Sequence, residues 1–241
     1  MNLNMNFSQR CVVDSLSLPW QTADSPQTKQ RWIERMDEAN DEANDEANDT
    51  GEGAMRTTRI LQFAPGATLD APLQNAEEEI LVLEGRFSDD RGDYGPGLFL
   101  KNPPGLSSTR VSEAGCTLFV KQRQSGKTSN PNAHDCARVA VDTVNAPWRP
   151  GLVAGLSVLP LHEFGTEHTA MVRWAPETWF SPHRHYGGEE IFVVEGVFED
   201  EHGRYPAGTW IRSPHLSQHQ PFSREGCLIL VKVGHLLETD H

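Results

Sequence analysis

Residues 78–87 read EEILVLEGRF, and residues 189–198 read EEIFVVEGVF. The two stretches belong to a longer internal match at an offset of 111 residues. Positions 57–121 align without a gap to positions 168–232, and 20 of the 65 aligned positions are identical. Self-similarity at a fixed offset indicates that the chain contains two copies of one structural unit.

The match extends toward the N-terminus, where VDSLSLPW at 13–20 resembles VDTVNAPW at 141–148. The offset there is 128, so the first copy contains 17 additional residues. These include a threefold DEAN repeat at 37–48, within the acidic insertion 37–52, which has eight acidic residues and no basic one. A tract of this kind has no apolar face to bury, so we expect a solvated loop. An acidic docking patch is the functional alternative.

Each copy is predicted to form β-structure. The runs ILVLEGRF and IFVVEGVF are short and rich in β-branched and aromatic residues, and clusters such as DDRGDYGPG at 89–97 and DEHGRYPAG at 200–208 separate them. Many short strands joined by turns favour an all-β fold that closes into barrels or double-sheet rolls. We predict two such domains, residues 1–130 and residues 131–241.

The composition narrows the class of protein. The 241-residue chain has a net charge of −13, which argues against a partner that is nucleic acid, because phosphate binding requires a cationic face. The four cysteines form no CxxC pair, and no run approaches 18 apolar residues. We therefore expect a cytoplasmic protein that does not enter a membrane.

The second copy contains a cluster of residues that can bind metal. His183 and His185 are two residues apart, so on a strand they share one face. Glu189 follows after Gly187-Gly188, and His219 comes from a later segment. Three imidazoles and one carboxylate are suitable ligands for Fe(II), Zn, Mn, Ni or Co. They do not form a site for an ion that requires thiolate ligands.

This spacing, HxHx3Ex6G followed by Gx5PxxxxH, resembles the two motifs of the cupin superfamily, and the double occurrence resembles a bicupin. The runs EEIFVVEGVFEDEHGRYPAGTW and SPHLSQHQPFSREGCLILVK are similar to the cupin domain of the ChrR anti-sigma factor. The resemblance implies two tandem cupin barrels, also called jelly rolls or double-stranded β-helices. It implies one divalent metal per chain, with Zn or Fe favoured over Mn or Ni. The implied ligands are His183, His185, Glu189 and His219.

The first copy lacks the same set of ligands. The matching positions hold Pro72, Gln74, Glu78 and Ser108, and proline offers no donor atom in its side chain. We expect a degenerate domain without metal, with a structural or pairing role.

The second copy departs from the cupin motifs at Glu177, Leu216 and Ser223, where the motifs have Gly, Gly and Asn. These departures concern turn geometry and remove no ligand.

Other residues near the motif are weaker candidates. Cys116 and Cys227 occupy matching positions at the start of apolar runs and are expected to be buried structural residues. Glu190 should point away from Glu189 and be solvated or salt-bridged. His215 is the best of the remaining histidines. The aromatic residues that flank the motif could line the mouth of a pocket, although most such residues are core: Trp174, Trp179, Phe180 and Trp210.

The resemblance implies a regulator, because ChrR-type cupins are the sensory part of an anti-sigma factor that responds to singlet oxygen and oxidative stress. Residues 1–56 lack the clustered His and Cys of its helical zinc-binding domain, so we do not expect inhibition of a sigma factor. The alternative is a mononuclear dioxygenase that acts on a diketone or aromatic ketone, and a metal-stabilised scaffold is a third reading. Catalytic residues are unassigned. A small-molecule ligand and a homodimer are compatible with either function.

Overall fold

The computed structural model describes residues 2–36, 56–73, 76–124 and 137–236. These residues form strands and turns, and none of them belongs to a helix. Accordingly, the part of the chain that the structure describes holds no helix suited to crossing a membrane. The acidic insertion 37–52 and Gln74 lie outside the described residues, so the expectation of a solvated loop stays a prediction.

The chain divides into two compact units. The first unit consists of Met1–Met5 and Leu18–Val144. It contains a seven-stranded sheet in the order β12-β9-β6-β11-β4-β3-β2 and a four-stranded sheet in the order β5-β10-β7-β8. Its strands are β2 (Gln21–Thr22), β3 (Thr28–Arg35), β4 (Arg56–Phe63), β5 (Ala67–Pro72), β6 (Ala76–Gly85), β7 (Phe87–Asp89), β8 (Gly92–Tyr94), β9 (Leu98–Asn102), β10 (Ser107–Ser112), β11 (Cys116–Gln124) and β12 (Val139–Asp142).

The second unit consists of Asn6–Ser17 and Asn145–His241. Its main sheet runs β1-β20-β18-β23-β15-β14-β13, with β16, β19 and β22 off this path, and β17 pairs with β21 separately. Its strands are β1 (Cys11–Asp14), β13 (Arg149–Pro150), β14 (Leu156–Phe164), β15 (Glu167–Trp174), β16 (Thr178–Trp179), β17 (His183–Arg184), β18 (Glu189–Asp200), β19 (Gly203–Pro206), β20 (Thr209–Ser213), β21 (Gln218–His219), β22 (Phe222–Ser223) and β23 (Cys227–Val233).

All sheet pairs are antiparallel, and each unit encloses its own apolar core. In the first unit Ile80 and Val82 of β6 point into a core with Leu118 and Val120 of β11. In the second unit Ile191 and Val193 of β18 take the same positions. The repeated ILV and IFV runs therefore form the centre of each sheet, and the prediction of an all-β fold with two tandem barrels is confirmed.

The glycine of the repeated EG pair has a defined structural reason. Gly85 and Gly196 have φ values of 69° and 70°. A Cβ at either position would lie 2.1 Å from the carbonyl oxygen of Gly115 or Gly226, respectively. Only glycine permits this close approach of two backbones, and both copies have kept it.

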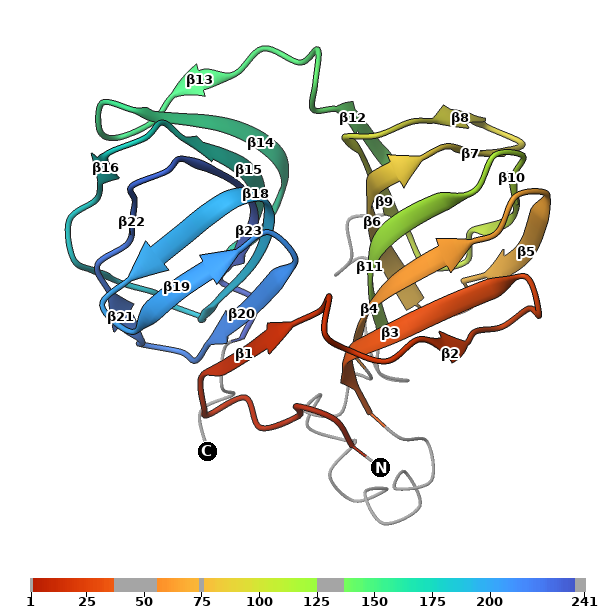
Figure 1. Ribbon diagram of the computed structural model, residues 1–241, viewed down its shortest axis with the longest axis horizontal. Coiled ribbons are helices and arrows are strands. Elements are labelled where there is room, and N and C mark those ends of the chain that lie inside the picture. The colour runs from red at the N-terminus through yellow and green to blue at the C-terminus, as the bar shows by residue number, and fades with distance from the viewer. Residues whose placement is uncertain (1, 37–55, 74–75, 125–136, 237–241) are drawn as a thin grey trace. The chain divides into compact units, whose positions relative to one another are not determined.

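The first strand of each copy pairs within the other copy's unit. Strand β1, at the start of the chain, pairs with β20 through contacts such as Val13 with Trp210. Strand β12, from the segment between the copies, pairs with β9 of the first unit through contacts such as Val141 with Phe99. Figure 1 shows both pairings. The units therefore differ from the predicted halves 1–130 and 131–241, because an edge strand adds to whichever sheet offers a free edge.

Candidate metal site

Two short strands bring three histidines of the second barrel together. His183 in β17 pairs with His219 in β21 across a two-residue ladder. His185 follows β17, and its backbone N–H donates to the carbonyl of Ser217 at 3.0 Å. The centroids of the three imidazole rings are 4.6–4.9 Å apart. One ring nitrogen from each histidine lies within 4.8 Å of the other two.

Glu189, the first residue of β18, adds a carboxylate to this cluster. Its Oε2 lies 3.4 Å from Nε2 of His185 and 3.5 Å from Nε2 of His219. The same oxygen is buried and has no hydrogen-bond partner. The structure therefore brings all four residues of the predicted ligand set to one place.

The donor set fits a divalent metal ion. The Nε2 atoms of His185 and His219 are 2.9 Å apart, and Glu189 Oε2 faces both of them without a hydrogen bond. A buried carboxylate oxygen without a partner is costly, and several lone pairs that converge on one point repel one another unless a cation lies between them. Three imidazole nitrogens and one carboxylate oxygen suit Zn and Fe(II) as well as Mn, Ni and Co.

Two of the imidazole rings are oriented by contacts on their far side. The Nδ1 of His183 lies 3.0 Å from the carbonyl oxygen of Ser181, and the Nδ1 of His219 lies 3.5 Å from Oδ2 of Asp200. A proton on Nδ1 suits both partners and leaves each Nε2 lone pair free for a metal. These contacts fix the tautomer that a ligand needs.

Asp200 is the centre of a polar group that lies outside the cupin motifs. It accepts hydrogen bonds from the hydroxyl of Tyr205 at 2.9 Å and from the guanidinium of Arg10 at 2.6 Å. Burial opposes the charged form of Asp200, but contact with His219, the charge of Arg10 and the backbone N–H of His202 outweigh burial and lower its pKa to about 2. Asp200 is therefore a permanent anion behind His219.

The sequence does contain a signal for this group. Asp200 and Tyr205 are identical to Asp89 and Tyr94 of the first copy, and Arg10 matches Arg138 at the offset of 128 residues. The cupin motifs do not include these positions, because none of them supplies a candidate metal ligand.

Burial shifts the pKa values of the cluster in opposite directions. Burial lowers the pKa of His185 to about 3, and the charges of His219 and His183 add to this effect. Burial raises the pKa of Glu189 to about 7. Burial also opposes the charged form of His219, but the contact with Asp200 and the charge of Glu189 outweigh it and raise the pKa of this ring.

The corresponding place in the first barrel holds an arginine. Arg110 is buried, and its guanidinium binds both carboxylate oxygens of Glu78. Asn102 and Gln122 donate to the same carboxylate at 3.2 and 3.1 Å. A guanidinium thus supplies a fixed positive charge opposite the glutamate that matches Glu189. Ser108, at the position of His219, leaves the site without the imidazole.

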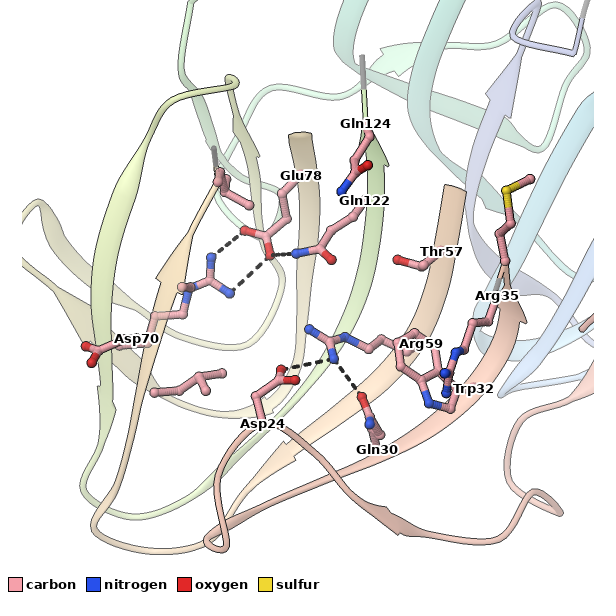
Figure 2. Close-up of a pocket in the computed structure, with 15 residues that line it drawn as sticks. Asp24, Gln30, Trp32, Arg35, Thr57, Arg59, Asp70, Glu78, Gln122 and Gln124 are labelled. Carbon is pink, nitrogen blue, oxygen red and sulfur yellow. Dashed lines mark hydrogen bonds and ion pairs between the residues drawn. The ribbon is translucent and has the colours of Figure 1, made fainter. Parts of the chain in front are cut away.

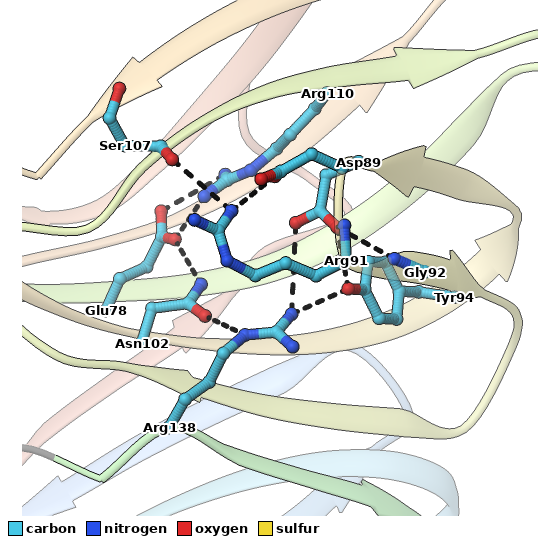
Figure 3. A network of polar contacts seen from close by, with 10 residues as sticks. Glu78, Asp89, Arg91, Gly92, Tyr94, Asn102, Ser107, Arg110 and Arg138 are labelled. Carbon is cyan, nitrogen blue, oxygen red and sulfur yellow. Dashed lines mark hydrogen bonds and ion pairs between the residues drawn. The ribbon is translucent and has the colours of Figure 1, made fainter.

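Figure 3 shows that the outer group survives in the first barrel. Arg138 donates to the hydroxyl of Tyr94 at 2.7 Å, and this hydroxyl donates to Asp89 at 2.7 Å. Arg138 also donates to Asn102 at 3.1 Å, which links the outer group to Glu78. The first barrel has therefore kept the Asp-Tyr-Arg arrangement although its histidines are absent.

The turns around the site keep their geometry despite the substituted glycines. Glu177 and Leu216 have φ values of 57° and 61°, and the matching residues of the first copy, Gly66 and Gly105, have 77° and 82°. The second copy therefore holds two non-glycine residues in the left-handed region, which strains the backbone. Ser223, at the third departure, is buried and donates to the carbonyl of Val197 at 2.7 Å.

The aromatic candidates separate into two groups. Trp174 and Trp210 are buried in the barrel. Trp179 is 47% exposed and stacks on Phe222 with ring centroids 4.1 Å apart. Phe180 meets the ring of His183 edge-on at 5.0 Å. Only the last of these contacts reaches the candidate metal site.

Two other candidates act beside the site. His215 accepts a hydrogen bond at Nδ1 from the backbone N–H of Gly187 at 2.8 Å, so it supports the turn between His185 and Glu189. Glu190 is buried and lies 2.9 Å from Nε2 of His235. Neither of these contacts involves a member of the three-histidine cluster.

Comparisons with known proteins agree with this architecture. The model of the ChrR cupin-like domain family matches residues 49–126 and 136–237. No curated protein sequence matches the chain.

Three solved structures share the fold at 11–15% identity, which supports the fold alone. A proposed dioxygenase of Nostoc punctiforme gives a TM-score of 0.70 at 15% identity, over 97% of this chain and 85% of that one. Protein Ylba of E. coli gives 0.69 at 11% identity, over 98% and 95%. Oxalate decarboxylase of Lactobacillus farciminis, in a formate complex, gives 0.64 at 12% identity, over 95% and 87%.

Proposed function

Because the chain belongs to the ChrR cupin-like domain family, we propose that it is a metal-binding regulatory cupin. In this proposal the second barrel holds one divalent ion, Zn or Fe(II), through His183, His185, Glu189 and His219. The observation that supports it best is the buried Glu189 oxygen, which has no hydrogen bond and faces two ring nitrogens at 3.4 and 3.5 Å. When bound, the metal supplies a positively charged partner for this buried oxygen.

The arrangement of strands gives metal binding a structural effect. β17 and β21 pair over only two residues each, which is too short a ladder to be stable alone. His183 and His185 lie at one strand and His219 lies in the other, so a shared ion would join the two segments. Metal occupancy would therefore control the order of residues 181–188 and 214–220, and this change is the proposed signal.

Exposure of one ligand would connect the signal to oxidants. His185 and His219 are buried, whereas His183 is only half-buried. A small oxidant would reach the His183 ring first, and oxidation of that ring would remove one of the four ligands. The free thiols Cys116 and Cys227 are compatible with a reducing cytoplasm, which is the location we propose.

Amide hydrogen exchange tests this proposal. Metal-loaded protein is compared with chelator-treated protein and with loaded protein exposed to singlet oxygen from an illuminated sensitiser. We expect residues 181–188 and 214–220 to exchange faster after chelation and after oxidation, together with release of the metal. Unchanged exchange and full metal retention after oxidation would contradict a sensory role.

A dioxygenase is the second candidate, and the half-buried position of His183 also favours it. One open side of the site would admit a substrate to the ion, provided that the ion keeps a free coordination position. An oxygen electrode distinguishes the two functions: iron-loaded protein is tested against diketones and aromatic ketones. Steady oxygen consumption in proportion to any of these substrates would replace the regulatory proposal.

A further inference from the structure

The first barrel contains a cavity of about 590 Å³ that the metal site does not use. Trp32 of β3, Thr57 and Arg59 of β4, and Glu78 of β6 contribute to its wall. Figure 2 shows Glu78 on one side of the cavity and Arg59 on the other. The volume lies within the range of small-molecule binding pockets.

Three polar atoms of this wall are buried without a hydrogen-bond partner. They are Nε1 of Trp32, Oγ1 of Thr57 and Nε of Arg59. The first and third atoms are donors only, and the hydroxyl can also donate. Trp32 and Arg59 are register partners on adjacent strands, and Thr57 lies two residues from Arg59, so its side chain shares that face. All three atoms are sealed from the cavity, and unpaired buried donors also occur at Arg31, Trp174 and Trp210. They therefore describe a polar wall around Arg59 and are not themselves contacts for a ligand.

The guanidinium of Arg59 is held in a fixed position. Its Nη1 donates to Gln30 at 2.6 Å and to Asp24 at 3.2 Å, and Arg59 is 7% exposed. Its Nη2 has no hydrogen bond to any residue in the described ranges, and Figure 2 shows it directed toward the middle of the cavity. The guanidinium also lies 5.2 Å from the ring of Trp32. Arg59 is thus ready to bind a further acceptor without losing its present contacts.

The acidic residues of the wall already have partners. Glu78 is bound by Arg110 and accepts from Asn102 and Gln122. Asp70 accepts from the hydroxyl of Thr109 at 2.7 Å. Asp24 is about half exposed at the edge of the cavity. The described part of the wall therefore presents Nη2 of Arg59 beside acidic side chains that already have partners, which is complementary to an anion.

We propose that this cavity binds a small organic carboxylate, with the carboxylate at Nη2 of Arg59. The planar guanidinium matches the two oxygens of a carboxylate. Three acidic side chains line the same cavity, and they disfavour the higher charge of a phosphate. The site is separate from the histidine cluster, so this proposal does not rest on the proposed function.

Titration of the full chain with defined probes tests the proposal. The probes are the singly charged carboxylates acetate and gluconate, with sorbitol as the uncharged match for gluconate and inorganic phosphate as the alternative anion. Binding is followed by calorimetry and by the indole N–H resonance of Trp32, which a Trp32→Phe variant assigns. We expect at least one carboxylate to bind at one site per chain and to shift this resonance, and sorbitol and phosphate to leave it unchanged.

Variants locate the binding. Arg59→Gln should weaken it by at least about tenfold, whereas Thr57→Val, which removes a hydroxyl that a ligand does not reach, should change it by less than about twofold. Arg91→Gln removes an arginine outside the cavity wall and should change nothing. Binding should also persist in His219→Ala. The proposal fails if no carboxylate binds, if phosphate binds instead, if Arg59→Gln binds normally, or if His219→Ala abolishes binding.

Discussion

Glu189 carries a cost that its counterpart Glu78 does not. Glu78 faces a guanidinium and two amides, whereas Oε2 of Glu189 has no hydrogen bond, and burial raises the Glu189 pKa to about 7. A carboxyl group with a raised pKa binds more protons in the folded state than in the unfolded state. Without metal, its contribution to stability is therefore full below about pH 4.5 and declines as pH rises to about 7.

Glu189→Gln should abolish metal binding and stabilise the metal-free protein at neutral pH by about 1–3 kcal/mol, because it removes a buried unpaired charge. Glu78→Gln is the matched control in the other barrel. It should destabilise the protein, because it leaves the buried Arg110 without its ion pair. Urea unfolding of both variants in chelator measures the two effects, and the same sign for both would refute the assignment.

Metal affinity should decrease in acid, and the pKa values of Glu189 and His219 should determine the pH range of this decrease. Below about pH 7 the metal must displace a proton from Glu189, so affinity should fall about tenfold per pH unit and more steeply once His219 is also charged. His185, with a pKa of about 3, should not compete above pH 4. Titration with a competing chelator at several pH values measures the slope. A constant affinity from pH 8 to pH 4 would contradict the ligand set.

The two copies provide a matched pair for the ligand assignment. His219→Ala should eliminate metal binding, whereas Ser108→Ala, at the same position of the first copy, should leave the metal content unchanged. Elemental analysis of protein purified without a chelating tag should give one ion per chain in the wild type. A content near two, or a loss in Ser108→Ala, would show that the first barrel also binds metal.

At the scale of residues, the sequence identified the members of the histidine–glutamate cluster better than their surroundings. His183, His185 and Glu189 lie within seven residues, so local spacing identifies them. Arg10 and Asp200 are 190 residues apart, and only the three-dimensional packing of β1 shows that they meet. Arg110 was missed for a different reason, since no metal motif contains the residue that takes the place of a metal.

At the scale of elements, the turn at Leu216 connects the strained backbone to the candidate metal site. Its N–H donates to the carbonyl of His185 at 2.9 Å, so the turn holds this ligand in place while its own φ is 61°. The first copy has Gly105 at the same point of the turn. The second copy thus maintains the position of His185 with a residue that is poorly suited to the conformation.

Leu216→Gly should therefore increase the free energy of unfolding by roughly 0.5–1 kcal/mol, because relief of strain exceeds the added entropy of the unfolded chain. The reverse substitution, Gly105→Leu, should destabilise the protein. A Cβ at Gly105 would contact no atom within 4 Å, so its effect reports φ alone. Thermal unfolding at fixed metal concentration measures both. A lower melting temperature for Leu216→Gly would mean that packing of the leucine outweighs the strain.

The strand pattern was predictable because the central runs of both copies alternate or continue as apolar residues, as in β6 and β18. The partners of β1 and β12 were not. Both are four-residue edge strands with alternating burial, CVVD and VAVD, and neither sequence encodes which sheet it joins. Each strand pairs with a sheet that has a free edge in a compatible register. Free edges exist only once the sheets have assembled, so the sequence of the strand alone does not reveal its partner.

At the scale of the whole molecule, this exchange makes the halves dependent on each other. A fragment of residues 131–241 lacks β1 and Arg10, so the edge of β20 would be exposed and Asp200 would lose an ion pair. We expect the fragment to be less stable than the full chain and to aggregate. A synthetic peptide of residues 6–17 should restore solubility and raise the melting temperature. A fragment as stable as the intact protein, with no response to the peptide, would contradict the exchange.

The pairing of β1 and β12 with the other copy's sheet also affects whether one copy can be lost during evolution. Deletion of the first copy would remove β1 together with the barrel that lacks the histidines, and the remaining copy would then carry an open edge at β20. Selection for the second copy therefore also preserves the first. The first copy can therefore hold Arg110 in place of a histidine cluster without being lost from the chain.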